Sequence, residues 1–426
     1  MTRLLWLALA ALTLGAAGGG LMAQRSSALP LAAVSVPATP ASTPPTPDGQ
    51  PEAVRPAPAQ PAPVETLALR WSVPEPRLVA GQVERRLVHG SADLAGPAQV
   101  EAARLGGTLA PLRGALDGVY AQLETRTPRD VRFTRVGAQW MGEARTGWTV
   151  DRAASDRAVL RALRAGGSAA LTIRLTPPPR SVRWAAAQGL GHVGTGTSSF
   201  VGSPEFRVHN IRVGAGKLHG RWIERGASFD FNALVGRVNA AGGFRPGYVV
   251  TGTTLSMEDG GGLCQVSTTV FRAAMTAGLP IQERHEHSYQ VGYYGEPGLD
   301  AAVYAPGKTL RWRNDFGGPL LVQTEWNMEG GRLDVHLFAR TDGRRVTIGA
   351  PEVSGTIRPP DPTFIADPAM KPGETRRVDM PAPGARVKVV RQITRADGTV
   401  RRDVTRSAYR AWGGVFAVAP GDERAQ

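Results

Sequence analysis

The feature that most constrains this chain is a run of three glycines, Gly260–Gly262, that leads into the apolar segment holding its only cysteine, Cys264. Apolar residues recur at helical spacing over 266–275, and Gly278 followed by Pro280 ends the pattern. A sole cysteine cannot form an intramolecular disulfide. At a helix start, free backbone N–H groups and the positive end of the helix dipole favour a thiolate. The segment therefore predicts a reactive thiol, with a buried cysteine acting as a small hydrophobe as the alternative.

The beginning of the chain has the composition of an export leader. A short basic start at Met1 to Arg3 precedes an apolar run over 4–14 and a series of small residues. We expect residues 1–24 to be a signal peptide or an N-terminal membrane anchor, and both alternatives stay open. Residues 25–77 are rich in proline and alanine and predict an extended linker. The protein is therefore expected to be exported to the cell envelope, either the periplasm or the cell wall.

The charge balance indicates the class of partner. The 426 residues include 50 lysines and arginines against 36 acidic residues, a formal charge of +14. In an exported protein this excess suits anionic wall polymers or lipid surfaces. The sequence has no zinc-finger spacing, phosphate loop or dinucleotide-binding motif. We therefore expect no nucleic acid partner, no cofactor and no metal.

Three folded parts of overall α+β class are expected. Residues 78–190 mix a helical stretch over 98–123 and a helix capped by Asp151 with short strands, which predicts a small α+β binding module. Residues 195–342 predict a glycine-rich mixed domain whose cysteine-bearing helix packs on antiparallel strands. Residues 343–418 alternate like strands, include an Asp397-Gly398 hairpin turn, and predict a small all-β tail.

Several strands are expected inside the glycine-rich domain. Segments 210–213 and 229–232 have strand character, and segments 284–291 and 298–304 follow the cysteine helix. Side chains alternate between the two faces of a strand, so a strand over 284–291 would point His285 and His287 to the same face.

Cys264, His287 and Asp300 occur in the order that a cysteine nucleophile, its general base and an orienting carboxylate would need. His287 follows Cys264 by 23 residues and Asp300 follows His287 by 13. This order is also that of transglutaminase-like and related cysteine peptidase folds, as a resemblance of arrangement only. The amides of Cys264 and Gln265 are the expected oxyanion donors, and His285 is the competing base.

Two other interpretations of these residues stay open. His287, Ser288 and Asp300 could form a hydrogen-bonded turn network that only supports the sheet. Cys264 and Asp300 with the two histidines are also chemically possible zinc ligands, although their spacing is not diagnostic of a zinc site.

A longer series of spaced motifs extends on both sides of the cysteine. The motifs are Arg207–Ile211, Phe229–Asn232 with Val235-Gly236, Gly247-Tyr248, Gly260–Thr269, Arg284 with His287-Ser288, and Gly298–Ala301. Through them, the region from about Thr195 to Ala339 resembles the VanW family, named for an accessory protein of vancomycin resistance clusters. The resemblance implies a place at the cell envelope near peptidoglycan and glycopeptide resistance, but no agreed reaction. The aromatic loop Gly292–Gly295 is where we expect members to differ.

The flanking parts carry shorter resemblances. Gly147–Asp151 with the helix after it is similar to a YoaR-type peptidoglycan-binding module that often precedes a VanW domain. The tail resembles an all-β wall-associated module through Lys371–Glu374 and Ser407–Tyr409.

These observations lead to one hypothesis and one alternative. We expect an exported protein that binds peptidoglycan and acts on its peptides as a cysteine-dependent peptidase or transpeptidase-like acyltransferase, with Cys264, His287 and Asp300 as catalytic residues. The alternative is a noncatalytic module that binds peptidoglycan or a partner in wall maintenance or glycopeptide resistance. The residues expected to bind the wall peptide are Gly260, Gly261, Gly262, Gln265, Ser267, Thr268, His285, Arg284 and Asn210.

Overall fold

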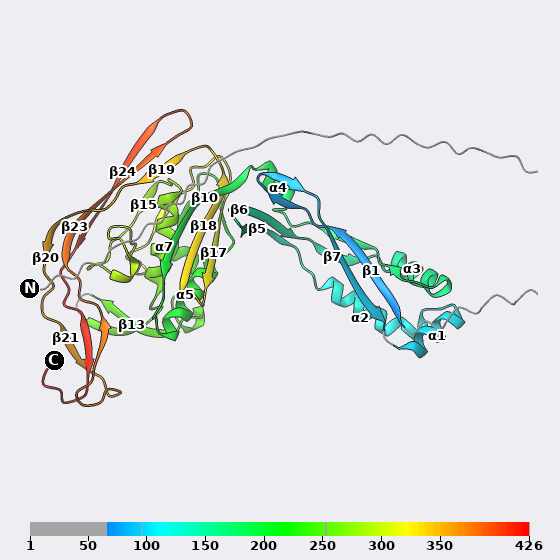
Figure 1. The fold of residues 1–426 in the computed structure, drawn as a ribbon, viewed down its shortest axis with the longest axis horizontal. Coiled ribbons are helices and arrows are strands. Elements are labelled where there is room, and N and C mark those ends of the chain that lie inside the picture. The colour runs from blue at the N-terminus through cyan, green and yellow to red at the C-terminus, as the bar shows by residue number, and fades with distance from the viewer. Residues whose placement is uncertain (1–65, 95, 252–253, 426) are drawn as a thin grey trace, which may run out of the picture. The chain divides into compact units, whose positions relative to one another are not determined.

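The computed structural model describes residues 66–94, 96–251 and 254–425 (Figure 1). Within these ranges it combines seven α-helices with many, mostly antiparallel, strands, which confirms the α+β class. The expected leader and most of the expected linker lie outside the described residues. Strand β1 falls inside the expected linker, and because its Leu67, Leu69 and Val73 are buried, that end of the linker prediction is wrong. No helix in the described ranges is long and apolar enough to cross a bilayer.

The N-terminal module, residues 66–187, holds three small sheets with strand orders β4-β1-β8, β3-β2-β6-β5 and β7-β9. Its strands are β1 Leu67–Pro74, β2 Arg77–Val79, β3 Gln82–Glu84, β4 Leu87–Leu94, β5 Arg129–Val136, β6 Gln139–Arg145, β7 Gly147–Val150, β8 Ala169–Ala170 and β9 Ile173–Thr176. Its helices are α1 Pro97–Gly106, the short η1 Ala110–Leu112, α2 Arg113–Glu124, α3 Arg152–Ala165 and α4 Val182–Ala187.

Two helix predictions in this module have different outcomes. The stretch 98–123 is two helices, because the chain leaves α1 at Gly107, whose φ of 63° lies in the left-handed region. Helix α3 begins as predicted, with the Asp151 side chain accepting a hydrogen bond from the Ala154 amide at 3.0 Å.

The central part contains a four-stranded antiparallel sheet of order β10-β18-β17-β11, a three-stranded sheet of order β12-β16-β15, and the hairpin β13-β14 (Figure 1). The strands are β10 Leu190–Ser199, β11 Arg221–Ile223, β12 Ser228–Asp230, β13 Pro246–Thr251, β14 Thr254–Asp259, β15 Ile281–Glu283, β16 Arg311–Arg313, β17 Leu320–Asn327 and β18 Arg332–Arg340. The helices are α5 Glu205–Leu218, α6 Phe231–Val235, η2 Ala240–Gly242, α7 Leu263–Thr276 and η3 Gly292–Tyr294.

Helix α7, which carries Cys264, packs directly on strands β10 and β18 as expected. The close approach depends on glycines of β10. A Cβ at Gly196 would stand 2.0 Å from the Thr269 carbonyl oxygen, and one at Gly194 would stand 2.8 Å from the Ala273 carbonyl oxygen. Only glycine lets the sheet and the helix backbone meet at this distance.

The two strands predicted before the cysteine, over 210–213 and 229–232, are wrong in whole or in part. Residues 210–213 lie inside helix α5, whose Gly214 lets the side chain of Leu263 rest against the helix backbone. Segment 229–232 changes from strand β12 to helix α6 at Phe231, where Asp230 caps the helix through the Ala233 amide at 3.2 Å.

The C-terminal module, residues 343–425, is all-β as predicted. Its strands are β19 Arg345–Ile348, β20 Glu352–Ile357, β21 Thr363–Ala366, β22 Thr375–Asp379, β23 Gly384–Thr394, β24 Val400–Tyr409 and β25 Val415–Val418. The long β23-β24 hairpin turns at Gly398, with a φ of 84°, where the sequence predicted it. Arg391 of β23 is 1 % exposed and donates to the carbonyl oxygens of Met275 and Leu279 at the end of α7.

Candidate active site

The glycine run places Cys264 on the first turn of α7. Gly260 and Gly262 adopt positive φ of 88° and 116°, and Gly262 is the residue before the helix. Buried Asn210 fixes this loop, because its amide nitrogen donates to the carbonyl oxygens of Arg245 at 2.9 Å and Gly261 at 3.2 Å. The thiol therefore sits where the helix dipole favours negative charge.

His287 is fixed by the buried carboxylate of Asp300. Its Nδ1 lies 2.5 Å from Asp300 Oδ2, and its backbone amide donates to the same oxygen at 2.9 Å. This contact leaves the other ring nitrogen, Nε2, to face the thiol, and His287 is a hydrogen-bond partner of Cys264. The three residues predicted as catalytic thus come together as a Cys264–His287–Asp300 relay.

The relay favours a thiolate beside an imidazolium. Burial works against charge on both groups, but hydrogen bonding to Asp300 and Cys264 raises the pKa of His287 to about 9. Burial likewise opposes ionisation of Cys264, yet hydrogen bonding and charge from His287, helped by Val303 and Arg207, lower the pKa of the thiol. The Val303 carbonyl oxygen accepts from the thiol, and its amide donates to the sulfur, each at 3.5 Å.

A pocket of about 370 Å³ opens beside the half-buried Cys264. It is lined by the glycine run and by residues of two other segments, including Phe231, Asn232, Val303 and Tyr304. His287 does not line it, so the thiol stands between this hollow and its base. We call this hollow the thiol pocket.

Comparison with known proteins identifies the region around the relay. The family described as VanW like protein matches residues 206–338. We call residues 206–338 the VanW-like domain after this match. The chain is similar to the uncharacterized protein YoaR of Bacillus subtilis (strain 168), 33% identical over 140 residues, which cover 33% of this chain and 45% of that protein. It is also similar to the vancomycin B-type resistance protein VanW of Enterococcus faecalis (strain ATCC 700802 / V583), 31% identical over 117 residues, 26% of this chain and 42% of that protein. The chain thus spans less than half the length of these curated relatives.

Several residues expected to bind the wall peptide make hydrogen bonds inside the VanW-like domain. The buried Gln265 side chain donates to the Ser199 carbonyl oxygen at 2.8 Å, and its backbone amide donates to Gly262 O at 3.0 Å, inside the first turn. Ser267 donates to Ala301 O at 2.5 Å, and Thr268 Oγ1 accepts from the Ala301 amide at 3.0 Å. These contacts clamp the segment that follows Asp300 onto α7.

Arg284 and His285 also have partners inside the protein. Arg284 donates from Nη2 to Asp300 Oδ1 at 2.7 Å and from Nε to the Asp300 carbonyl oxygen at 2.6 Å. His285 Nε2 lies 2.9 Å from Glu283 Oε1. The competing base is therefore directed to a different carboxylate. In the described part of the chain, no three histidine, cysteine, aspartate or glutamate side chains are arranged to hold a metal ion.

The strands predicted over 284–291 and 298–304 are both wrong, because β15 ends at Glu283 and no further strand forms in the described chain before β16. The chain then runs irregularly, with a single bridge between His285 and Ala302. His287 is positioned by Asp300 rather than by a strand face, so its alternation with His285 does not set its direction.

Three residues of the VanW-like site were not predicted from the sequence as site residues. The guanidinium of Arg207 helps to lower the Cys264 pKa and donates to Tyr293 Oη at 3.2 Å. The ring of Tyr294 lies 5.4 Å from that of His287. Tyr409, from the C-terminal module, donates to Asp300 Oδ1 at 2.5 Å and accepts from the Gly298 amide at 2.9 Å. Arg207 and Tyr409 stood in quoted motifs and Tyr294 in the aromatic loop, but nothing local linked Tyr409 to Asp300.

Proposed function

We propose that this is an exported cell-envelope protein whose VanW-like domain acts on peptidoglycan peptides by cysteine-dependent acyl transfer or hydrolysis. The observation that carries the proposal is the Cys264–His287–Asp300 relay, in which a sole cysteine at a helix start meets a histidine held by a buried carboxylate. The vancomycin resistance named for the enterococcal relative supports a substrate in the cell wall.

The reaction follows from the protonation states. The Cys264 thiolate attacks the carbonyl carbon of a peptide bond held in the thiol pocket. The tetrahedral intermediate collapses as the His287 imidazolium gives its proton to the leaving amine, which leaves a thioester on Cys264 and a neutral imidazole. Water or an acceptor amine then attacks the thioester and gives its proton to His287, and the thiolate is released. Asp300 stabilises the imidazolium in the first and last states.

The N-terminal module supports docking on the wall. A hollow of about 710 Å³ there is lined by Trp71, Trp148 and Arg126 among others. The guanidinium of Arg126 lies 4.3 Å from the Trp148 ring centroid. Aromatic and cationic groups around a hollow suit a saccharide or peptide carrying carboxylates. The formal charge of +14 adds attraction to anionic wall polymers.

The first test is the alkylation rate of Cys264 against pH, followed by mass spectrometry in the folded and the denatured protein. Because Cys264 is the only cysteine, the label reports one site. We expect fast alkylation well below pH 8 that is lost on unfolding and in His287→Ala. The matched control is His285→Ala, which removes the neighbouring imidazole bound to Glu283 and leaves the profile unchanged.

The second test is turnover of purified wall peptides. Cys264→Ala is expected to abolish turnover while far-UV circular dichroism and the unfolding midpoint stay close to those of the parent. Retained turnover in a folded Cys264→Ala variant contradicts the proposal.

A noncatalytic binding module is the second candidate. It is favoured by the two contacts of the sulfur with the Val303 backbone, which also suit a structural cysteine. In that case the folded thiol does not react, and Cys264→Ser binds wall peptides as tightly as the parent does.

A further inference from the structure

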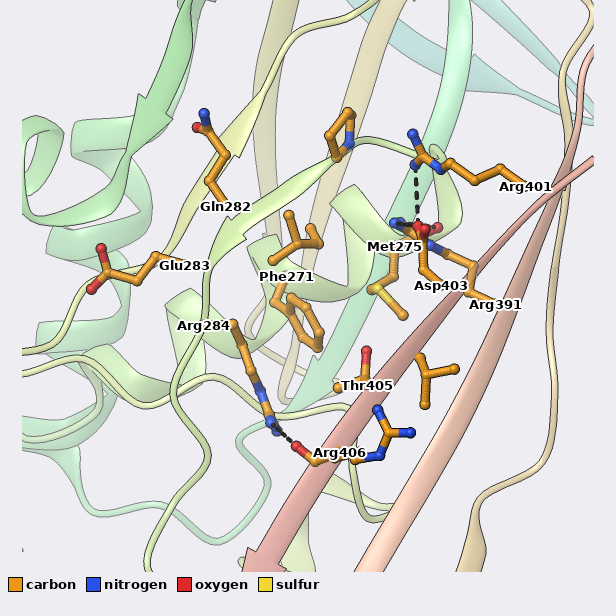
Figure 2. Close-up of a pocket in the computed structure, with 13 residues that line it drawn as sticks. Phe271, Met275, Gln282, Glu283, Arg284, Arg391, Arg401, Asp403, Thr405 and Arg406 are labelled. Atoms are coloured by element: carbon orange, nitrogen blue, oxygen red, sulfur yellow. Dashed lines mark hydrogen bonds and ion pairs between the residues drawn. The ribbon is translucent and has the colours of Figure 1, made fainter.

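Two strand edges face each other across a second hollow, whose lining shares no residue with the thiol pocket. Strand β15 hydrogen-bonds to β16, and β24 hydrogen-bonds to β23; neither has another strand partner in the described chain. A pocket of about 530 Å³ lies between them, and Figure 2 shows Gln282, Glu283 and Arg284 on one side with Thr405 and Arg406 on the other. Unpaired strand edges are templates for an added strand. We call this hollow the edge groove.

The edge groove has an apolar floor and closed ends. Phe271 and Met275 of α7 lie between the two strands and are each 1 % exposed (Figure 2). At one end Arg284 Nη1 donates to the Arg406 carbonyl oxygen at 3.1 Å. At the other end Arg401 Nη2 donates to Asp403 at 3.1 Å. From Arg401 to Arg406 a strand extends about 16 Å, which is room for four or five extended residues.

The charge around the edge groove is positive. Its lining includes four arginines and two acidic residues, Glu283 and Asp403. Arg391 and Arg401 both donate to Asp403, so one carboxylate serves two guanidinium groups. Arg406 is exposed at the rim. A bound molecule with carboxylates would neutralise the excess positive charge of the groove.

We propose that the edge groove binds a short extended peptide bearing carboxylates, which adds as a strand along β24. Backbone hydrogen bonds to the free edge provide the general affinity, and the rim arginines select acidic side chains. The proposal goes beyond the cysteine chemistry and does not need it. Because Arg284 also holds Asp300, the bound peptide lies against the support of the relay.

The experiment is isothermal titration calorimetry of the full chain with acetyl-Val-Glu-Val-Glu-Val-amide. The comparison peptides carry lysine for glutamate, or methylated backbone nitrogens at alternate residues. We expect saturable binding of the acidic peptide, and at least tenfold weaker binding of both comparison peptides. Arg406→Ala is expected to weaken binding roughly tenfold. The matched control is Arg402→Ala on the same strand, which is exposed, bonds Gln392 and lies outside the groove.

Three outcomes would overturn the proposal. Equal binding of the methylated peptide would mean that no strand is added. Equal weakening by Arg402→Ala would mean that the peptide meets only general surface charge. Displacement of the peptide by equimolar inorganic phosphate would indicate a simple anion site. Binding is expected to persist in Cys264→Ala, so failure of the cysteine chemistry and failure of the edge groove are told apart.

Discussion

Asp300 is the residue on which the candidate site is built. Its buried carboxylate receives hydrogen bonds from Arg284, from the backbone and ring of His287, and from Tyr409. Burial alone would favour the neutral acid, but the hydrogen bond and charge of His287, with those of Arg284 and Tyr409, hold the pKa of Asp300 well below its usual value. The carboxylate therefore stays charged while the imidazole it holds changes protonation state.

The raised pKa of His287 predicts how stability depends on pH. Its pKa is about 9 in the folded protein and about 6.5 in an unfolded chain. The stabilisation is therefore fully present below pH 6.5 and is lost as pH rises through 9. We expect the contribution of His287 to the free energy of unfolding to fall by about 1–3 kcal/mol between pH 6.5 and 10, partly offset by Cys264, whose lowered pKa adds stability as pH rises towards its unfolded value of about 8.5. Urea titrations across this range check it, and an equal fall in His287→Asn would assign the loss to other groups.

Tyr409→Phe tests the hydroxyl that reaches Asp300 from the C-terminal module. The variant leaves Asp300 and the Gly298 amide each short of one buried partner. We expect a loss of about 1–3 kcal/mol in stability. Weaker support of the imidazolium also raises the pKa of Cys264, so the alkylation profile moves to higher pH. An unchanged profile in the folded variant would show that Tyr409 has no part in positioning the relay.

At the scale of elements, a helix or strand was predictable from the sequence where local signals decide the structure, and it was not where distant contacts decide it. Helix α7 was predictable because its glycine start, apolar spacing and Gly278-Pro280 end are all local signals. The structure of segment 284–291 was not predictable, because distant residues position its side chains. His287 is held by Asp300, and Tyr289 donates to Asp379 at 2.6 Å. The alternation there reflects long-range partners rather than a strand.

Glycine also misled the sequence interpretation in one place and supported it in another. Gly214 follows the segment 210–213 that was predicted as a strand, but it lies in the interior of α5, where the missing Cβ makes room for Leu263. Glycines of β10 do the same for α7. Which of these roles a glycine has depends on the element facing it, and the sequence does not show that element.

A pair of substitutions tests this use of glycine. Gly196→Ala places a methyl group 2.0 Å from Thr269 O and must push α7 away from the sheet. We expect a loss of roughly 2–4 kcal/mol and slower alkylation of Cys264. Gly216→Ala in α5 meets no atom within 4 Å and is expected to be neutral or stabilising by about 0.5–1 kcal/mol. Chemical denaturation measures the free energy of unfolding of both variants, and equal values for the two variants would refute the close packing.

At the scale of the whole molecule, the C-terminal module is part of the candidate site. The sequence separated residues 343–418 as a tail with no active-site residue. In the structure Tyr409 supports Asp300, Arg391 closes the end of α7, and Tyr289 stacks on Trp412 with ring centroids 5.0 Å apart. These contacts join positions more than a hundred residues apart, which is why spacing and alternation could not reveal them.

Removal of the C-terminal module therefore has a definite expected outcome. A chain ending at residue 342 keeps Cys264, His287 and Asp300, but it exposes the end of α7 and the apolar floor of the edge groove. It also leaves Asp300 without the Tyr409 hydroxyl. We expect a lower unfolding midpoint and loss of the fast alkylation below pH 8, measured against the intact chain. If the shortened chain unfolds cooperatively with the parent's alkylation profile, the VanW-like domain is self-sufficient and the tail is only an attachment. The alkylation profile is also measured in the full-length Tyr409→Phe variant. This measurement separates loss of the single hydroxyl from loss of the whole module, since only the truncation removes the Arg391 contacts with α7.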